Sequence, residues 1–223
     1  MAGDTAPSAF RFLSPAVQGP AWRGGYAGQQ QSVGMSVYGF HDQIRMSQGV
    51  AVNAGVAEIL LVQIPGALKA WRAEQQDDRN GTDWWVECES GHVLSIDVKA
   101  RSTDYLATAN KDDLALELFS DIDELKPGWS LRTDKRTDYI LWFWEPTGRW
   151  CLVPFPMLCH VFRKYRDDWS KVYQHAVQWS IDGARRWRSE CLFVDRKEVW
   201  RAIYRCYGKA FIKVPTGGSN GQP

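Results

Sequence analysis

The sequence predicts an α/β (α+β) protein in which a central sheet is flanked by helices. Residues 83–88 and 93–99 alternate polar and apolar side chains around a glycine turn, as the two strands of a hairpin do. The uninterrupted apolar run over 138–144 predicts a strand that is buried on both faces. Apolar residues recur at helical spacing after Pro156 and again over 196–207, which predicts a helix at each place.

The other expected elements follow from turn residues and shorter apolar patterns. Pro65-Gly66 and Pro127-Gly128 are turn signals that separate neighbouring elements. In chain order we expect helices over 49–62 and 66–75, a strand or short helix over 114–119, a strand over 150–153 and a helix over 168–179.

A chain of 223 residues with 44% hydrophobic and 24% charged residues is typical of one globular domain. Residues 1–36 are rich in Gly, Gln, Ser, Ala and Pro, which predicts a flexible leader. We expect the core over 37–165, a basic helical extension of the same domain over 166–215, and a disordered tail over 216–223.

Composition also excludes several classes of protein. No run of eighteen apolar residues is present, so we expect no membrane span, and the first residues do not form a secretory signal. Five cysteines without a regular pattern fit a reducing compartment, so we expect a cytoplasmic protein. Cys151, Cys159 and His160 lack a second close-spaced pair of ligands, which disfavours a zinc site.

The hairpin around Glu89-Ser90-Gly91 is the most informative segment. A three-residue loop with Gly91 at positive φ sets Asp83 opposite Asp97. Lys99 points to the same side as Asp97, because side chains alternate along a strand. The other face then carries only apolar side chains: Trp84, Val86, Cys88, Leu94, Ile96 and Val98. A register shifted by one residue would mix charges into that apolar face and is disfavoured.

Two facing carboxylates repel one another, and a cation between them would relieve this repulsion. Mg²⁺ or Mn²⁺ suits such oxygen ligands, and a bound metal activates water against a phosphate. Lys99 could position that water or stabilise charge on the phosphate. A plain alternative is a solvated sheet face with a weak Asp97–Lys99 surface pair.

The pattern acid-x-Lys occurs three times, and local context separates the three copies. Glu124 and Lys126 precede a turn. Asp195 is typical of a helix N-cap, because Glu198 follows three residues later as in a capping box. Only Asp97 and Lys99 lie in a strand with an acid across the hairpin.

Asp83 followed after thirteen residues by Asp97-Val98-Lys99 resembles the PD-(D/E)xK nuclease superfamily of restriction enzymes, junction resolvases and repair nucleases. Thr82 replaces the proline of the family pattern. The resemblance covers about residues 50–165 and implies a restriction-endonuclease-like αβββαβ core with a mixed sheet. It implies Mg²⁺ or Mn²⁺ held by Asp83, Asp97 and the Val98 carbonyl, with Lys99 positioning the water. Glu58 matches the helix acid that the family often adds, or is an ordinary exposed residue.

Charge is distributed unevenly along the chain. Residues 160–213 hold thirteen Lys and Arg against six Asp and Glu, although the whole chain has a net charge of only +1. A basic segment beside an acidic catalytic half suits an enzyme that acts on polyanions. The candidate contacts to nucleic acid are Arg101, Lys135, Arg136, Arg185, Arg186 and Arg188.

These observations predict a metal-dependent deoxyribonuclease, with endonuclease action as the leading expectation and double-stranded or branched DNA as the partner. The residues leave open DNA or RNA as substrate, and a homodimer or a subunit of a larger phage or mobile-element assembly. A different class of function is a non-catalytic module on the same fold that binds nucleic acid or protein.

Overall fold

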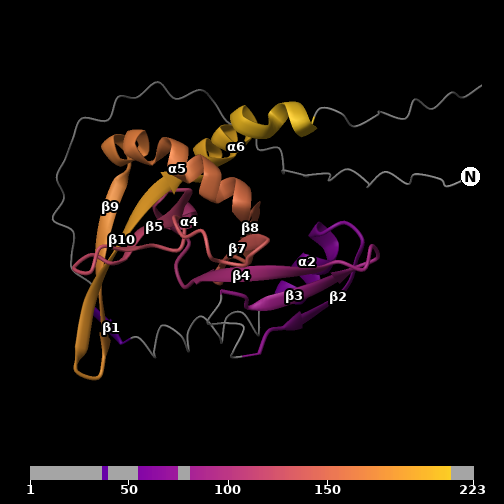
Figure 1. The fold of residues 1–223 in the computed structure, drawn as a ribbon, viewed down its shortest axis with the longest axis horizontal. Helices are drawn as coiled ribbons and strands as arrows, with labels where there is room; N and C mark the ends of the chain where they lie inside the picture. Colours follow the sequence, from indigo (N-terminus) through magenta and orange to yellow (C-terminus); the bar gives the residue numbers. More distant parts are fainter. Residues whose placement is uncertain (1–36, 40–54, 75–80, 212–223) are drawn as a thin grey trace, which may run out of the picture.

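Two five-stranded sheets and the helices packed on them make up the described part of the chain (Figure 1). The computed structural model describes residues 37–39, 55–74 and 81–211, of which 37–39 and 209–211 are described as backbone only. The elements are β1 (Val37–Gly39), α2 (Val56–Gln63), β2 (Ala67–Arg72), β3 (Trp84–Cys88), β4 (Val93–Arg101), α4 (Tyr105–Ala109), β5 (Asp113–Asp121), β6 (Lys126–Pro127), β7 (Tyr139–Trp144), β8 (Arg149–Pro154), α5 (Phe155–Val172), β9 (Gln174–Asp182), β10 (Arg185–Asp195) and α6 (Arg196–Phe211).

The first sheet has the strand order β2-β3-β4-β7-β8 and is mixed. Strands β4 and β7 pair in parallel, whereas the other three neighbouring pairs are antiparallel. The expected α+β class with a mixed sheet is therefore confirmed. Strand β7 lies between β4 and β8 and is almost entirely buried, as its apolar sequence predicts.

The β3–β4 hairpin has the predicted register. Trp85 pairs with Ser95 and Glu87 with Val93, and Gly91 has a φ of 79° in the loop. The N–H of Asp83, the residue before β3, donates to the carbonyl of Ile96 at 2.8 Å, which extends the contact between the two strands beyond the last pair, Trp84 and Ile96. The direct pairing of Asp83 with Asp97 stays a prediction.

Each face of the first sheet is covered by different elements. Helix α2 packs its buried side chains against the apolar face that carries Val86, Ile96 and Val98. The opposite face packs into a larger core that includes side chains of α5, α6, β5 and β10. Asp97 and Lys99 lie on this second face, because they pair in parallel with Ile140 and Trp142 of that core.

The second sheet has the strand order β1-β9-β10-β5-β6. Its long β9–β10 hairpin turns at Gly183, which has a φ of 58°, and extends away from α5 and α6 (Figure 1). The expected basic helical extension over 166–215 is helical only in part, because residues 174–182 and 185–195 form the strands β9 and β10 between α5 and α6. The sequence after Tyr173 alternates as a strand does, although its apolar residues can also be fitted to a helix.

Other expected elements have mixed outcomes. The helices from Pro156 and over 196–207 are confirmed as α5 and α6, and the strand over 150–153 is confirmed as β8. The helix over 66–75 is wrong, since β2 occupies that segment, and the helix over 168–179 is wrong beyond Val172. The ambiguous segment 114–119 is part of strand β5. Residues 49–54, the leader and the tail lie outside the described residues.

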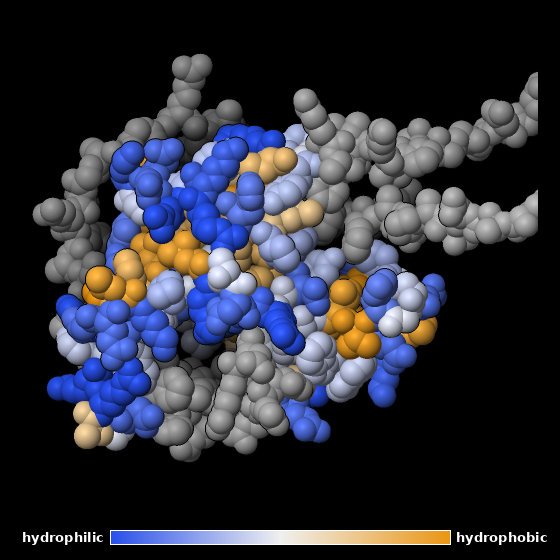
Figure 2. Space-filling model, viewed as in Figure 1, coloured by the Kyte–Doolittle hydropathy of each residue, from blue (hydrophilic) through white to orange (hydrophobic). Residues whose placement is uncertain are grey.

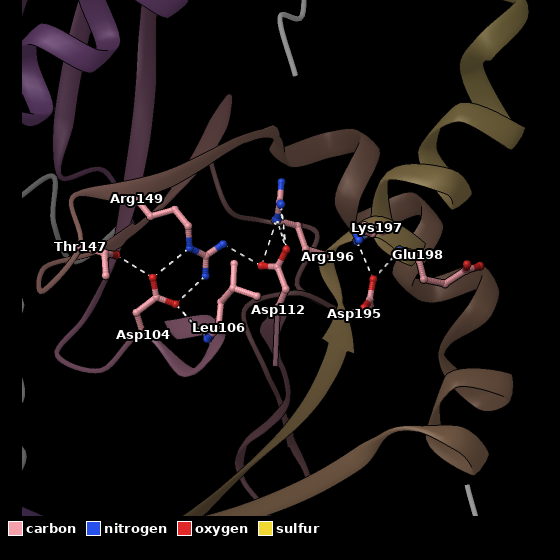
Figure 3. A network of polar contacts seen from close by, with 9 residues as sticks. All are labelled: Asp104, Leu106, Asp112, Thr147, Arg149, Asp195, Arg196, Lys197 and Glu198. Atoms are coloured by element: carbon pink, nitrogen blue, oxygen red, sulfur yellow. Dashed lines mark hydrogen bonds and ion pairs between the residues drawn. The ribbon is translucent and has the colours of Figure 1, made fainter. Parts of the chain in front are cut away.

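A network of ion pairs joins the two sheets (Figure 3). Arg149 of β8 binds Asp104, the N-cap of α4, at 2.8 Å and Asp112, which precedes β5, at 2.7 Å. Arg196, the first residue of α6, binds the other oxygen of Asp112 at 2.7 Å. The hydrogen bonds from Arg149 hold the pKa of Asp104 well below its usual range. The two arginines thus fix the ends of α4, β5 and α6 against the first sheet.

The surface is mostly hydrophilic, with separate apolar areas (Figure 2). Leu61, Val62 and Leu68 are exposed on α2 and β2, at the edge of the first sheet. None of the helices that the structure describes is both long and apolar enough to cross a membrane.

We expect Arg149→Ala to lower the free energy of unfolding by roughly 3 kcal/mol, because it leaves buried Asp104 without its main partner. Chemical denaturation at neutral pH measures this loss. Arg132→Ala is the matched control, since Arg132 binds Asp134 in an exposed pair, and it should leave stability almost unchanged. Equal effects of the two changes would contradict a structural role for the network.

Candidate active site

Asp97 is the centre of the candidate site. Asp97 is only 2% exposed, and it lies on the face of β4 that packs into the larger core. The ammonium of Lys99 lies 2.8 Å from one carboxylate oxygen, and the ammonium of Lys135 contacts the other. Burial alone would raise the pKa of Asp97, but the two ammonium groups prevail and hold that pKa below its usual range. Asp97 is therefore a buried carboxylate anion with a cation on each oxygen.

Lys135 reaches Asp97 from the loop before β7, and this loop is anchored near the start of β4. The N–H of Ser95 donates to the Asp138 carboxylate at 2.8 Å, and the Ser95 hydroxyl donates to the Arg136 carbonyl at 2.9 Å. Gly81 has a φ of 84°, and a Cβ there would collide with the Lys135 side chain. Glycine at 81 therefore lets the chain before β3 pass beside this lysine.

Asp83 precedes β3 and is fixed against β4 by backbone hydrogen bonds. Its carboxylate accepts a hydrogen bond from the N–H of Val98 at 2.6 Å. Burial would lower the pKa of Lys99, but the negative charges of Asp97 and then Asp83 prevail and raise it. Lys99 is thus an ammonium at neutral pH. Burial and the positive charge of Lys99 instead lower the pKa of Lys135.

An acid and two aromatic rings complete the surroundings of the two lysines. Glu117 of β5 is close enough to interact with both ammonium groups, and burial raises its pKa. Its carboxylate accepts the N–H of Trp129 at 2.9 Å. The Trp129 ring lies 5.5 Å from the Lys99 ammonium, and the Phe155 ring lies 5.5 Å from that of Lys135. These rings exclude water from one side of the ion pairs and attract their positive charge.

Glu58 is not brought into this group. It is exposed on α2, which covers the opposite face of the sheet. Within 55–74 and 81–208, no three His, Cys, Asp or Glu residues gather as a metal-binding group. Of the three expected carboxylate ligands Glu58, Asp83 and Asp97, only Asp83 and Asp97 therefore lie close to Lys99.

The expected phosphate contacts fall into three places. Arg101 follows Lys99 on the same face of β4, where burial lowers its pKa. Arg136 is exposed in the loop beside the site. On the β9–β10 hairpin, Arg185 and Arg186 are exposed, but Arg185 forms ion pairs with Asp121 and Glu124 at 3.5 Å, and Arg188 forms one with Asp123. Lys135 differs from its predicted role, because its side chain is 8% exposed and binds Asp97 instead of facing solvent.

The sequence interpretation missed three residues of the site: Lys135 as a partner of Asp97, Glu117 and Trp129. Glu117 could have been noticed, because a carboxylate inside the apolar run 114–118 needs a buried partner. Lys135 and Trp129 carry no local signal, since they reach the site from the long connection between β5 and β7.

Comparison with known proteins identifies no relative of this chain. No family model matches the chain, and the searches of curated proteins and of solved structures give no significant match either.

We expect Lys135→Met to destabilise the protein more at neutral pH than in acid. The low pKa of Asp97 means that its ion pairs stabilise the fold above about pH 4, near the pKa of an unfolded aspartate, and that this contribution is lost as the pH falls through the folded pKa. The difference in unfolding free energy between the wild type and the variant should therefore shrink below about pH 4.

Denaturant unfolding of both proteins between pH 3 and pH 7 measures this difference. Lys126→Met is the control, because Lys126 is exposed on β6. A difference for Lys135→Met that stays constant across this range would show that Lys135 does not stabilise the Asp97 anion.

Proposed function

We propose that the protein is a metal-dependent nuclease that hydrolyses phosphodiester bonds, most simply of DNA, with Mg²⁺ or Mn²⁺. The observation that carries the proposal is one patch of a rigid hairpin that presents Asp83, Asp97 and Lys99 together. The two carboxylates are the oxygen ligands that Mg²⁺ prefers, and the adjacent ammonium can stabilise negative charge on the phosphate.

The order of elements supports the resemblance to the PD-(D/E)xK superfamily. Elements α2, β2, β3, β4, α4 and β7 follow one another in the order αβββαβ, with β5 and β6 inserted between α4 and β7. The acid-x-Lys strand β4 pairs in parallel with the last strand of that order. Helix α4 has only five residues, so the second helix of the pattern is reduced here.

The donor set fits a divalent metal of the Mg²⁺ type. Such an ion is usually held by one or two carboxylates and completes its shell with water and substrate phosphate, so a third acid is not required. Asp97 and Asp83 would hold it, with the Val98 carbonyl as the further ligand that the resemblance implies. Bound there, the ion would polarise the phosphate and lower the pKa of a water molecule.

Lys99 acts in this proposal as a donor and not as a base. Its pKa is raised by the two aspartates, so it keeps its proton at neutral pH and donates hydrogen bonds to the attacking water or the phosphate. Lys135 is the lysine with the lowered pKa, and it neutralises Asp97 when substrate and metal are absent. Exposed Arg136, Arg185 and Arg186 add positive charge that attracts a polyanion.

One observation favours a non-catalytic nucleic-acid-binding module as the second candidate. Both oxygens of Asp97 already have ammonium partners, so the cluster is electrostatically complete without a metal. In that case Asp97 only positions two lysines, and binding would not depend on divalent ions.

Cleavage assays on labelled linear, circular, single-stranded and branched DNA and on RNA, with Mg²⁺, Mn²⁺ or EDTA, test the proposal. We expect metal-dependent cleavage that falls at least about 100-fold in Asp97→Asn and in Lys99→Met, because each change removes a group that acts on the transition state. Glu124→Gln and Lys126→Met are matched controls, since they alter another acid-x-Lys sequence on exposed residues and should retain full activity.

Folded wild-type protein that cuts none of these substrates would overturn the nuclease proposal. Activity that survives in both Asp97→Asn and Lys99→Met would equally remove the hairpin as its site. Metal-independent binding without cleavage would instead favour the non-catalytic module.

A further inference from the structure

We propose that a pocket beside Lys99 receives one unpaired nucleotide of the nucleic acid, next to the phosphate that is cut. This inference rests on the proposed function and narrows its substrate to strands with an unpaired nucleotide at the cleavage position. Single strands, frayed ends and branched junctions offer such a nucleotide, whereas an intact duplex has to expel a base from its stack.

The pocket lies between the end of β4 and one face of the second sheet, and its volume is about 400 Å³. Its lining includes Lys99 and Arg101 from β4, Glu117 from β5 and Trp129 from the loop that follows β6. The β9–β10 hairpin contributes Gln178, Ser180, Trp187, Ser189 and Cys191.

The register explains why these hairpin residues face the same space. Gln178 pairs with Ser189 and Ser180 pairs with Trp187, so the four side chains share one face of the hairpin. Trp179 pairs with Arg188 and therefore lies on the opposite face. On β5 and β10, the face opposite the pocket holds Leu116 and Leu192 in the core shared with α5 and α6.

The chemistry of the lining matches a nucleotide. Trp129 and Trp187 are aromatic surfaces on which a base can stack, and stacking tolerates any base. Gln178, Ser180 and Ser189 offer donors and acceptors for the edge of a base. Lys99 and Arg101 provide positive charge for the phosphate, and an anion would compensate the burial that lowers the pKa of Arg101.

Size and position restrict the ligand further. A volume of about 400 Å³ falls within the usual range of small-molecule sites and suits one nucleotide, whereas a base pair with two backbones is too large. Lys99 lines the pocket and also binds Asp97, so a nucleotide in the pocket has its phosphate beside the candidate catalytic group. The pocket thus selects the strand that reaches the site.

Binding is tested without cleavage, by anisotropy of a labelled twelve-nucleotide single strand and of a labelled duplex in EDTA. We expect the single strand to bind more tightly, and Trp187→Ala to weaken its binding about tenfold, as the loss of one stacking partner does. Trp179→Ala is the matched control on the other face of the hairpin and should change affinity less than threefold. Trp187→Phe keeps an aromatic ring and should restore most of the affinity if the alanine variant is impaired only in stacking.

Cleavage is then compared on duplexes that differ at one position. One duplex is fully paired, one carries a single unpaired nucleotide, and one carries an abasic residue at that position. We expect the wild type to cut the unpaired substrate at least tenfold faster than the other two, and Ser189→Phe, which fills the pocket, to lose this preference. An abasic substrate that is cut as fast as the unpaired one would overturn the inference.

The failures of the two proposals are distinguishable. Cleavage that needs Asp97 and Lys99 but ignores base pairing and Trp187→Ala would overturn the pocket and leave the nuclease. Strand binding that depends on Trp187, without cleavage of any substrate, would support the pocket as a nucleotide site and overturn the nuclease.

Discussion

The buried carboxylate of Asp97 is the constraint on which the candidate site depends. An anion that is 2% exposed must have cationic or hydrogen-bonding partners, and it has one ammonium on each oxygen. Lys99 comes from the same strand, but Lys135 comes from a distant loop. The need to neutralise one carboxylate therefore fixes the loop before β7, the glycine at 81 and the position of Glu117 beside both lysines.

The second sheet converts this site from an open sheet face into the wall of a pocket. Strand β5 belongs to the insertion between α4 and β7, and β9 and β10 follow α5. The ion pairs of Arg149 and Arg196 fix the start of β5 and of α6 against the first sheet. A hairpin alone would leave Lys99 on an open sheet face, whereas here Lys99 lines a pocket together with residues of the second sheet.

The sequence was sufficient for the local features of the site and insufficient for its distant parts. The register of the β3–β4 hairpin followed from Gly91 and from the need to bury one face, and the structure confirms it. The strand β2 was mistaken for a helix because the short run after Gly66 has no clear alternation. The pattern of β9 fits both a strand and a helix, and the contacts of Lys135 depend on tertiary packing, which no local pattern contains. Glu58 was placed by resemblance alone, and its helix covers the other face.

Calorimetric titration of the protein with Mn²⁺ measures directly whether Asp83 and Asp97 hold a divalent ion. We expect saturable binding to the wild type and loss of binding in Asp97→Asn. Binding to Lys135→Met should be tighter, because the competing ammonium is gone. Binding that is absent from the wild type and from Lys135→Met, or that is unchanged in Asp97→Asn, would contradict a metal site on this hairpin.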